Sequence, residues 1–226
     1  MCAKYQDFLD RLKEERIAKR WTQQQMGHKL RMTQSHYSKA ELGTRRFTYY
    51  EMKCLCESGI DAYYIFTGRR CEPEYRELLA GYTYDELKCY LAVLCSIAGH
   101  LYRKGMLHLG RGICKKIEAI QYSLALCKDD KTVFYSLRRG AGFSQKEMAD
   151  KLEVDVKKLR DMENGNVFPD SEIMWKMWKE TGVPFSVILD DADSLRGEVS
   201  EMAALIEDGE RRRMLAYLKA FSDVLR

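Results

Sequence analysis

Apolar positions recur every three or four residues through most of the chain, which is the spacing of helices with one buried side. In residues 16–48 this stripe consists of Met26, Leu30, Tyr37 and Ala40, with polar residues between them. Hydroxyl residues at 22 and 33 stand just before each half of the stripe, where they can cap helix N-termini. The pattern predicts a helix of about eight residues, a short turn and a second helix of about seven residues that ends near position 43.

The same pattern occurs twice. Residues 16–48 align without gaps with residues 138–170 at an offset of 122, and one inserted residue then brings 59–60 into register with 182–183. In the second copy Ser144 and Asp155 are the expected caps, and Leu159 and Met162 continue the stripe. The chain therefore contains two copies of one module of about 60 residues, a repeat that must shape the fold.

The remaining segments also predict helices. Residues 72–104 and 106–128 have helical apolar spacing, with glycines at 105, 110 and 112 marking the break between them. Residues 198–226 read as one or two amphipathic helices, interrupted near Gly209, whose stripe could be intramolecular core or a dimer seam. We expect an all-α protein with a first module at 1–70, a helical connector at 71–127, a second module at 128–193 and a helical tail at 194–226.

Composition and motifs exclude several classes of protein. Hydrophobic residues are 46% and charged residues 32% of the 226 residues, an ordinary globular balance. The longest charge-free apolar stretch, 89–102, has 14 residues, whereas a membrane helix needs about 20. The N-terminus does not resemble a signal peptide, so we expect a cytoplasmic protein without membrane contact.

No catalytic or metal-binding pattern is evident. The 8 cysteines include no C-x-x-C pair, and the 4 histidines are scattered without zinc spacing. Nucleophile elbow, P-loop and dinucleotide-binding motifs are also missing from the sequence. We therefore expect no enzyme, no metal, no cofactor and no small-molecule ligand.

Positive charge is concentrated in the N-terminal third. Residues 1–70 contain 14 Lys and Arg against 8 Asp and Glu, whereas residues 132–193 contain 9 against 12. A polyanion would therefore bind the first module rather than the second.

The repeated string T/S-Q-x-x-M-x-x-x-L-x-(M/V)-(T/D)-x-x-x-(Y/L)-x-x-x-E-x-G resembles the Cro and repressor (XRE-type) family of helix-turn-helix DNA-binding proteins. The resemblance covers residues 5–68 and 128–191 and implies two lambda-repressor-like domains. Two departures from the family pattern stand out: the turn between the helices has Arg31 and Glu153 where glycine is usual, and Phe47 replaces a proline that the second copy retains as Pro169.

The resemblance also implies one ion pair in each copy, between an arginine of the first helix and a glutamate at the end of the recognition helix. The pairs are Arg16 with Glu41 and Arg138 with Glu163. We expect each pair to orient the recognition helix rather than to add stability, because desolvation offsets much of the attraction.

In this family the second helix of the motif enters the major groove of DNA. Gln34 could then bond adenine and Lys39 guanine, while Gln23 and the arginines at 45 and 46 would contact phosphates. The DNA-binding residues implied for the first copy are Gln23, Thr33, Gln34, Ser35, His36, Ser38, Lys39, Thr44, Arg45 and Arg46.

The second copy differs at these positions. Lys39 corresponds to Asp161, and the segment 44–46 corresponds to Asn166, Val167 and Phe168. The second copy is thus either a weaker DNA reader or a protein-interaction module. If it binds DNA, the residues concerned are Gln145, Lys157, Lys158, Arg160 and Asn166.

Two functions are therefore considered. The first is a bacterial or mobile-element transcriptional regulator, a repressor, that binds double-stranded DNA as a homodimer formed through the connector or the tail. The alternative is a protein-interaction regulator, antitoxin-like or anti-repressor-like, on the same scaffold.

Overall fold

The computed structural model describes residues 4–125, 132–183 and 185–206, together with residues 213, 216 and 220. Within this part of the chain every regular element is an α-helix, which confirms the all-α prediction. The predicted helical residues 126–128 and most of the tail beyond 206 lie outside the described residues. The helices are α1 (Tyr5–Ala18), α2 (Gln23–Lys29), α3 (Gln34–Glu41), α4 (Tyr49–Glu57), α5 (Ala62–Thr67), α6 (Pro73–Leu78), α7 (Tyr84–Arg103), α8 (Arg111–Ala125), α9 (Val133–Gly140), α10 (Gln145–Leu152), α11 (Val156–Glu163), α12 (Ser171–Thr181), α13 (Phe185–Leu189) and α14 (Ala192–Ala204).

Side-chain caps fix where the repeated helices begin. The Thr22 and Thr33 hydroxyls accept backbone N–H groups at the starts of α2 and α3. Ser144 and Asp155 do the same for α10 and α11. These four caps confirm the predicted helix starts, because each satisfies an N–H group that would otherwise have no partner.

The turns between the paired helices contain a residue in the left-handed region. Arg31 follows α2 and Glu153 follows α10, each with φ of 56°. This backbone conformation costs a residue with a side chain about 1 kcal/mol or more, which is why glycine is usual there. The same chain path is therefore built twice without that glycine.

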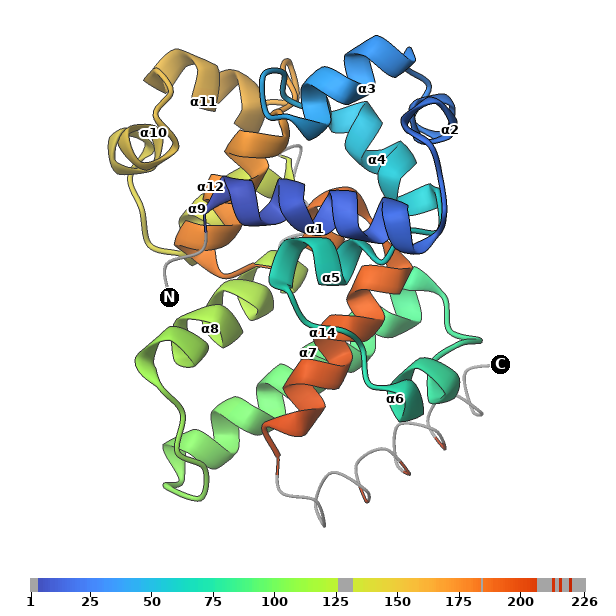
Figure 1. Ribbon diagram of the computed structural model, residues 1–226. Helices are drawn as coiled ribbons and strands as arrows, with labels where there is room; N and C mark the ends of the chain where they lie inside the picture. Colours follow the sequence, from blue (N-terminus) through green and yellow to red (C-terminus); the bar gives the residue numbers. More distant parts are fainter. Residues whose placement is uncertain are drawn as a thin grey trace.

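One core joins the two repeated halves of the chain. The apolar faces of α1–α5 and of α9–α13 bury their side chains in a single cluster. Near its centre the rings of Phe66 and Phe185 are stacked, with centroids 3.4 Å apart. Figure 1 shows α2 and α3 beside α10 and α11 at one end of the molecule, with α7, α8 and α14 at the other. The halves are thus packed against each other directly, in addition to being linked by the segment between them.

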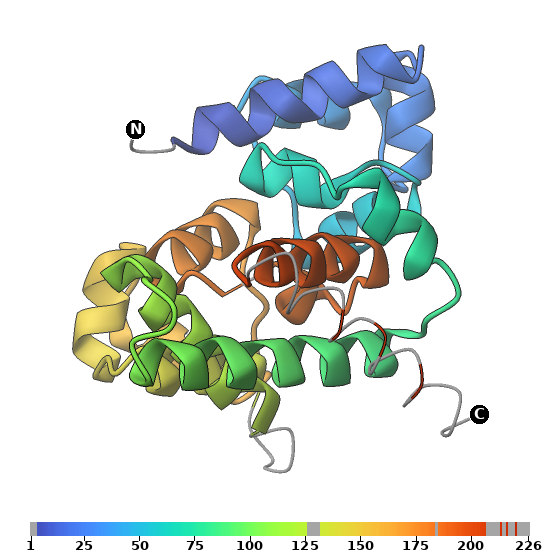
Figure 2. The same ribbon diagram turned by 90° about the horizontal axis from the view of Figure 1, so that it is seen from below.

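A second core lies beneath the first. It consists of the apolar faces of α6, α7, α8 and α14. Figure 2 shows α14 (red) lying between α5 and α7, and both neighbours contact it. Val199, Met202 and Ile206, part of the apolar stripe of the tail, are buried here. These three side chains are therefore occupied within the chain, and the predicted dimer would need other residues.

The helical spacing over 72–104 conceals a break. α6 ends at Leu78, and α7 begins only after the Thr83 cap. The Arg196 guanidinium from α14 donates to the carbonyl oxygen of Leu79 at 3.0 Å and reaches that of Ala80 at 3.4 Å. Arg196 lies 117 residues from Leu79 in the sequence, so the local apolar periodicity could not reveal this contact at the break.

Candidate nucleic-acid interface

The helices α2 and α3 present one buried side and one exposed side. Met26, Leu30, Tyr37 and Ala40 are fully buried in the first core, as their spacing predicts. The opposite side of α3 consequently faces solvent. Figure 1 places this helix at the outer end of the molecule.

The buried carboxylate of Glu41 holds the C-terminal end of α3 in place. Arg16 donates two hydrogen bonds to Glu41, from Nε to Oε1 at 2.7 Å and from Nη2 to Oε2 at 3.1 Å. Tyr37 donates its hydroxyl to Glu41 at 2.9 Å. Burial raises the pKa of Glu41, but the donors together outweigh burial and hold that pKa below its ordinary value. The predicted pair is present, and it ties the C-terminal end of α3 to α1.

Gln23 belongs to this same network. Its side-chain Nε2 donates to Glu41 at 2.8 Å, and its Oε1 lies 3.4 Å from the Nε2 of Gln34. The sequence predicted that this side chain contacts a DNA phosphate. The structure instead commits its amide to the carboxylate behind α3, so only its backbone N–H remains suited to the predicted phosphate contact.

The second copy repeats the network almost residue for residue. Arg138 pairs with Glu163 through two hydrogen bonds. Gln145 donates to the same carboxylate at 2.8 Å. Leu159 takes the place of the tyrosine, so the fourth donor is missing. Both predicted ion pairs are therefore confirmed, and both glutamines donate to the carboxylates that hold α3 and α11.

The outward side of α3 carries hydrogen-bonding groups. Gln34, Ser35, His36 and Lys39 are exposed, and Ser38 is half-buried. In the described part of the chain the Lys39 ammonium has no ion-pair partner. Thr33 is exposed too, although its hydroxyl serves as the cap. The sequence did not single out one neighbour, Leu42, whose side chain is 70% exposed beside this polar surface.

The two arginines after α3 are not free. Arg45 donates to both carboxylate oxygens of Glu51, at 2.8 and 2.7 Å. Thr44, by contrast, is exposed and donates its hydroxyl to the Lys39 carbonyl at 3.0 Å. Arg46 pairs with Glu172 of the other copy, and its guanidinium lies 5.0 Å from the ring centre of Tyr5. The prediction of two free phosphate anchors therefore needs correction, because each guanidinium already has a carboxylate partner.

Glu51 was predictable as a partner but Glu172 was not. Glu51 stands three residues after Thr48, and the two form a capping box at the start of α4. Burial raises the pKa of Glu51, but the hydrogen bonds from Arg45 and Thr48 prevail and lower it. Glu172 comes from α12, and only the tertiary packing of the two copies brings it near.

The outward side of α11 is also exposed, with different chemistry. Lys157, Arg160 and Asn166 are exposed, and Lys158 is half-buried. None of the three cations has an ion-pair partner in the described ranges. Val167 and Phe168 follow as partly exposed apolar residues. This surface therefore carries three cations, although residues 132–193 contain more acidic than basic residues.

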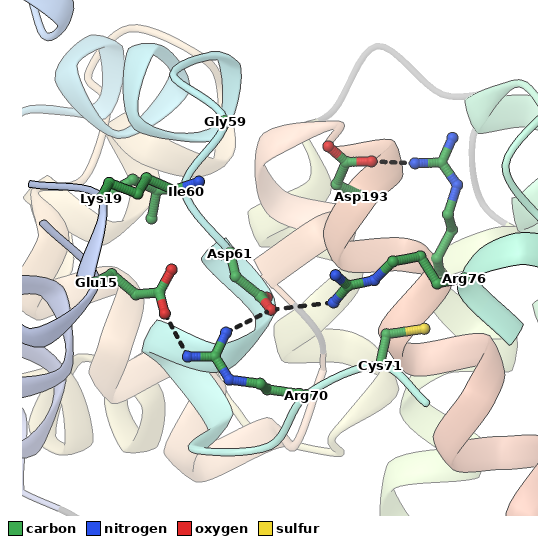
Figure 3. Close-up of a pocket in the computed structure, with 10 residues that line it drawn as sticks. Glu15, Lys19, Gly59, Ile60, Asp61, Arg70, Cys71, Arg76 and Asp193 are labelled. Atoms are coloured by element: carbon green, nitrogen blue, oxygen red, sulfur yellow. Dashed lines mark hydrogen bonds and ion pairs between the residues drawn. The ribbon is translucent and has the colours of Figure 1, made fainter. Parts of the chain in front are cut away.

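A separate hollow of about 240 Å³ lies between α1, α5, α6 and α14. Figure 3 shows Arg70 between Glu15 and Asp61, with Arg76 directed at the same Asp61. Asp193 pairs in turn with an arginine of its own helix. Glu15, Asp61 and Asp193 each already have an arginine partner, which favours a structural role for this cluster over a ligand site.

No group of three or more His, Cys, Asp or Glu side chains in the described residues could hold a metal ion. None of the helices in that part of the chain combines the length and apolar character that a bilayer span requires. No protein-family model matches the sequence, and no curated protein or solved structure is significantly similar to it.

Proposed function

We propose that this protein is a sequence-specific DNA-binding regulator of transcription, a repressor that occupies an operator. The observation that carries the proposal is α3, a short helix whose inner side is buried and whose outer side exposes hydrogen-bonding side chains. A helix of this size fits the major groove, which is about 12 Å wide. The resemblance of α2 and α3 to the helix-turn-helix of Cro and repressor proteins supports the same assignment, as does that of α10 and α11.

Gln34 and Lys39 have the chemistry for reading base edges. A glutamine amide can bond both N6 and N7 of adenine, and a lysine can donate to O6 and N7 of guanine. Each such contact is worth about 1–3 kcal/mol of discrimination. Catalysis has no part in this function, and the place of action is the bacterial cytoplasm, where the DNA is.

Base reading is tested with duplexes selected from a random library by the purified chain. Gln34→Ala should relax preference at one base pair, whereas Lys104→Ala, at the far end of the molecule, should leave all affinities unchanged. Fluorescence anisotropy against single-base variants of the selected duplex measures both. Equal loss on every sequence from Gln34→Ala would contradict its role as a reader.

Phosphate binding is tested by freeing an arginine. Glu51→Gln keeps the capping box, since glutamine also serves there, but removes the charge that holds Arg45. We expect tighter binding to all duplexes and a plot of log affinity against log salt that is steeper by about 0.9, the contribution of one phosphate. Glu57→Gln removes the same charge from the exposed end of α4 and is the matched control. An unchanged slope for Glu51→Gln would exclude Arg45 from the interface.

The alternative function, a protein-interaction regulator, has one observation in its favour. Tyr50, Val167 and Phe168 are exposed apolar side chains, 64%, 39% and 43% accessible, at the junction of the two copies. Such a patch can bind a partner protein. This function would be preferred if the purified chain selected no duplex while a defined partner bound it and Tyr50→Ser abolished that binding.

A further inference from the structure

The two copies meet through equivalent segments. Arg46 and Glu172 form an ion pair, and the rings of Phe168 and Tyr50 meet with centroids 5.6 Å apart. At the repeat offset of 122, Arg46 corresponds to Phe168 and Tyr50 corresponds to Glu172. Position 46 of the first copy thus contacts the equivalent of position 50 in the second copy, and the equivalent of position 46 in the second copy contacts position 50 of the first. This exchange is the signature of an interface with two-fold symmetry, here within one chain.

The interface is buried and hydrogen-bonded, so it fixes the two copies in place. Ser171 donates its N–H to the carbonyl of Phe47 at 2.9 Å, and its hydroxyl accepts the N–H of Phe47 at 3.1 Å. The hydroxyl of Tyr5 lies 2.7 Å from the same Ser171 oxygen. Buried polar groups satisfied in this way, together with the stacked phenylalanines, favour one arrangement over others.

The arrangement places both candidate recognition helices at the same end of the molecule. Figure 1 shows α3 and α11 at the same end of the molecule, on either side of the junction. The outward side chains of both helices are exposed, and Lys39 on one and Lys157 on the other have no ion-pair partner in the described part of the chain. A pair of helices related by a two-fold axis is the geometry that binds two half-sites on one face of a duplex.

We infer that a single chain binds two unlike half-sites on one DNA duplex, α3 on one and α11 on the other. This inference rests on the proposed function. The half-sites must differ because the reading residues differ: Gln34 corresponds to Val156, and Lys39 corresponds to Asp161. Asp161 can accept a hydrogen bond from the cytosine amino group, whereas Lys39 donates to guanine. The target is therefore asymmetric, and no second chain is required.

The first test is stoichiometry and position. Native mass spectrometry of the full chain on its selected duplex should give one chain per duplex. Lys39→Ala should relax preference in one half of the duplex, and Lys157→Ala should relax it in the other, each by about tenfold or more at the contacted base pair. Lys115→Ala, an exposed cation on α8, is the matched control and should change nothing. Two chains on a symmetric duplex, the homodimer expected from sequence, would overturn the inference.

The second test uses the rigidity of the interface. Inserting five base pairs between the half-sites rotates one by about half a turn. Affinity should fall to that of a single half-site, because α3 and α11 cannot follow. Full affinity after the insertion would overturn the inference. Specific binding that depends on Lys39 but not on Lys157 would refute the role of α11 and leave the proposed function standing, whereas no specific binding by any form would refute both.

Discussion

Removing the Arg16 guanidinium should destabilise the protein by about 3 kcal/mol at neutral pH. Arg16 and Glu41 have side chains 11% and 4% exposed, so Arg16→Met leaves a buried carboxylate without its cation. Breaking a buried pair by removing one partner costs about 3–5 kcal/mol. The lower end applies because Gln23 and Tyr37 still donate to Glu41.

The cost should shrink as the pH falls. In the native protein the hydrogen bonds hold the pKa of Glu41 below its ordinary value of 4.5. Its stabilising contribution is therefore complete above about pH 4.5 and is lost as the pH falls through the lower native pKa. In Arg16→Met the effect of burial weighs more, so the pKa of Glu41 rises and the variant protonates first. As the pH falls, protonation of Glu41 removes the unpaired buried charge of the variant before it destabilises the native protein. The difference in their free energies of unfolding therefore becomes smaller.

Urea unfolding followed by circular dichroism, at a series of pH values from 7 to 4, measures this difference. Lys13→Met is the matched control, because it removes an exposed cation from the same helix and should cost less than about 0.5 kcal/mol. The reasoning is refuted if Arg16→Met costs no more than Lys13→Met, or if its cost is the same at every pH.

Three further changes test other parts of the fold by the same unfolding assay. Gly197→Ala should destabilise the protein by about 1–3 kcal/mol, because its new Cβ would lie 2.4 Å from the Tyr63 ring. Gly99→Ala, whose Cβ would meet nothing nearer than 3.9 Å, should not destabilise it. Equal effects of the two substitutions would contradict the close packing of α14. Arg31→Gly should stabilise by about 0.5–1 kcal/mol, because it relieves a left-handed residue, and a loss of stability would show that the turn is unstrained. Arg46→Ala should cost about 1 kcal/mol, since its ion pair is half-exposed, and no change in the urea midpoint would mean that this bridge does not hold the copies together.

The local parts of this structure could be predicted from sequence because their causes are local. Thr22 and Thr33 cap helices through N–H groups three residues away, and the stripe at Met26 and Leu30 needs only helical periodicity. The pair Arg16 and Glu41 is 25 residues apart, so only the family resemblance suggested it.

The partners of the candidate DNA-binding residues could not be predicted in this way. Two arginines after a recognition helix look like phosphate anchors when only the sequence is considered. Arg46 is held instead by Glu172, at a separation of 126 residues. Gln23 likewise turns toward Glu41 because that buried carboxylate needs donors on every side. Residue type gives the available chemistry, but tertiary packing decides which partner uses it.

The junction between the copies uses different contacts on its two sides. In a symmetric homodimer each position would have to make the same contact on both sides, so one arginine would meet one glutamate twice. Here one side of the junction is the ion pair of Arg46 and Glu172, and the other is the aromatic contact of Phe168 and Tyr50. Covalent linkage allows the two sides to differ, because neither must match a copy of itself. The same freedom extends to α3 and α11, so an asymmetric junction and two unlike outward surfaces have one physical origin.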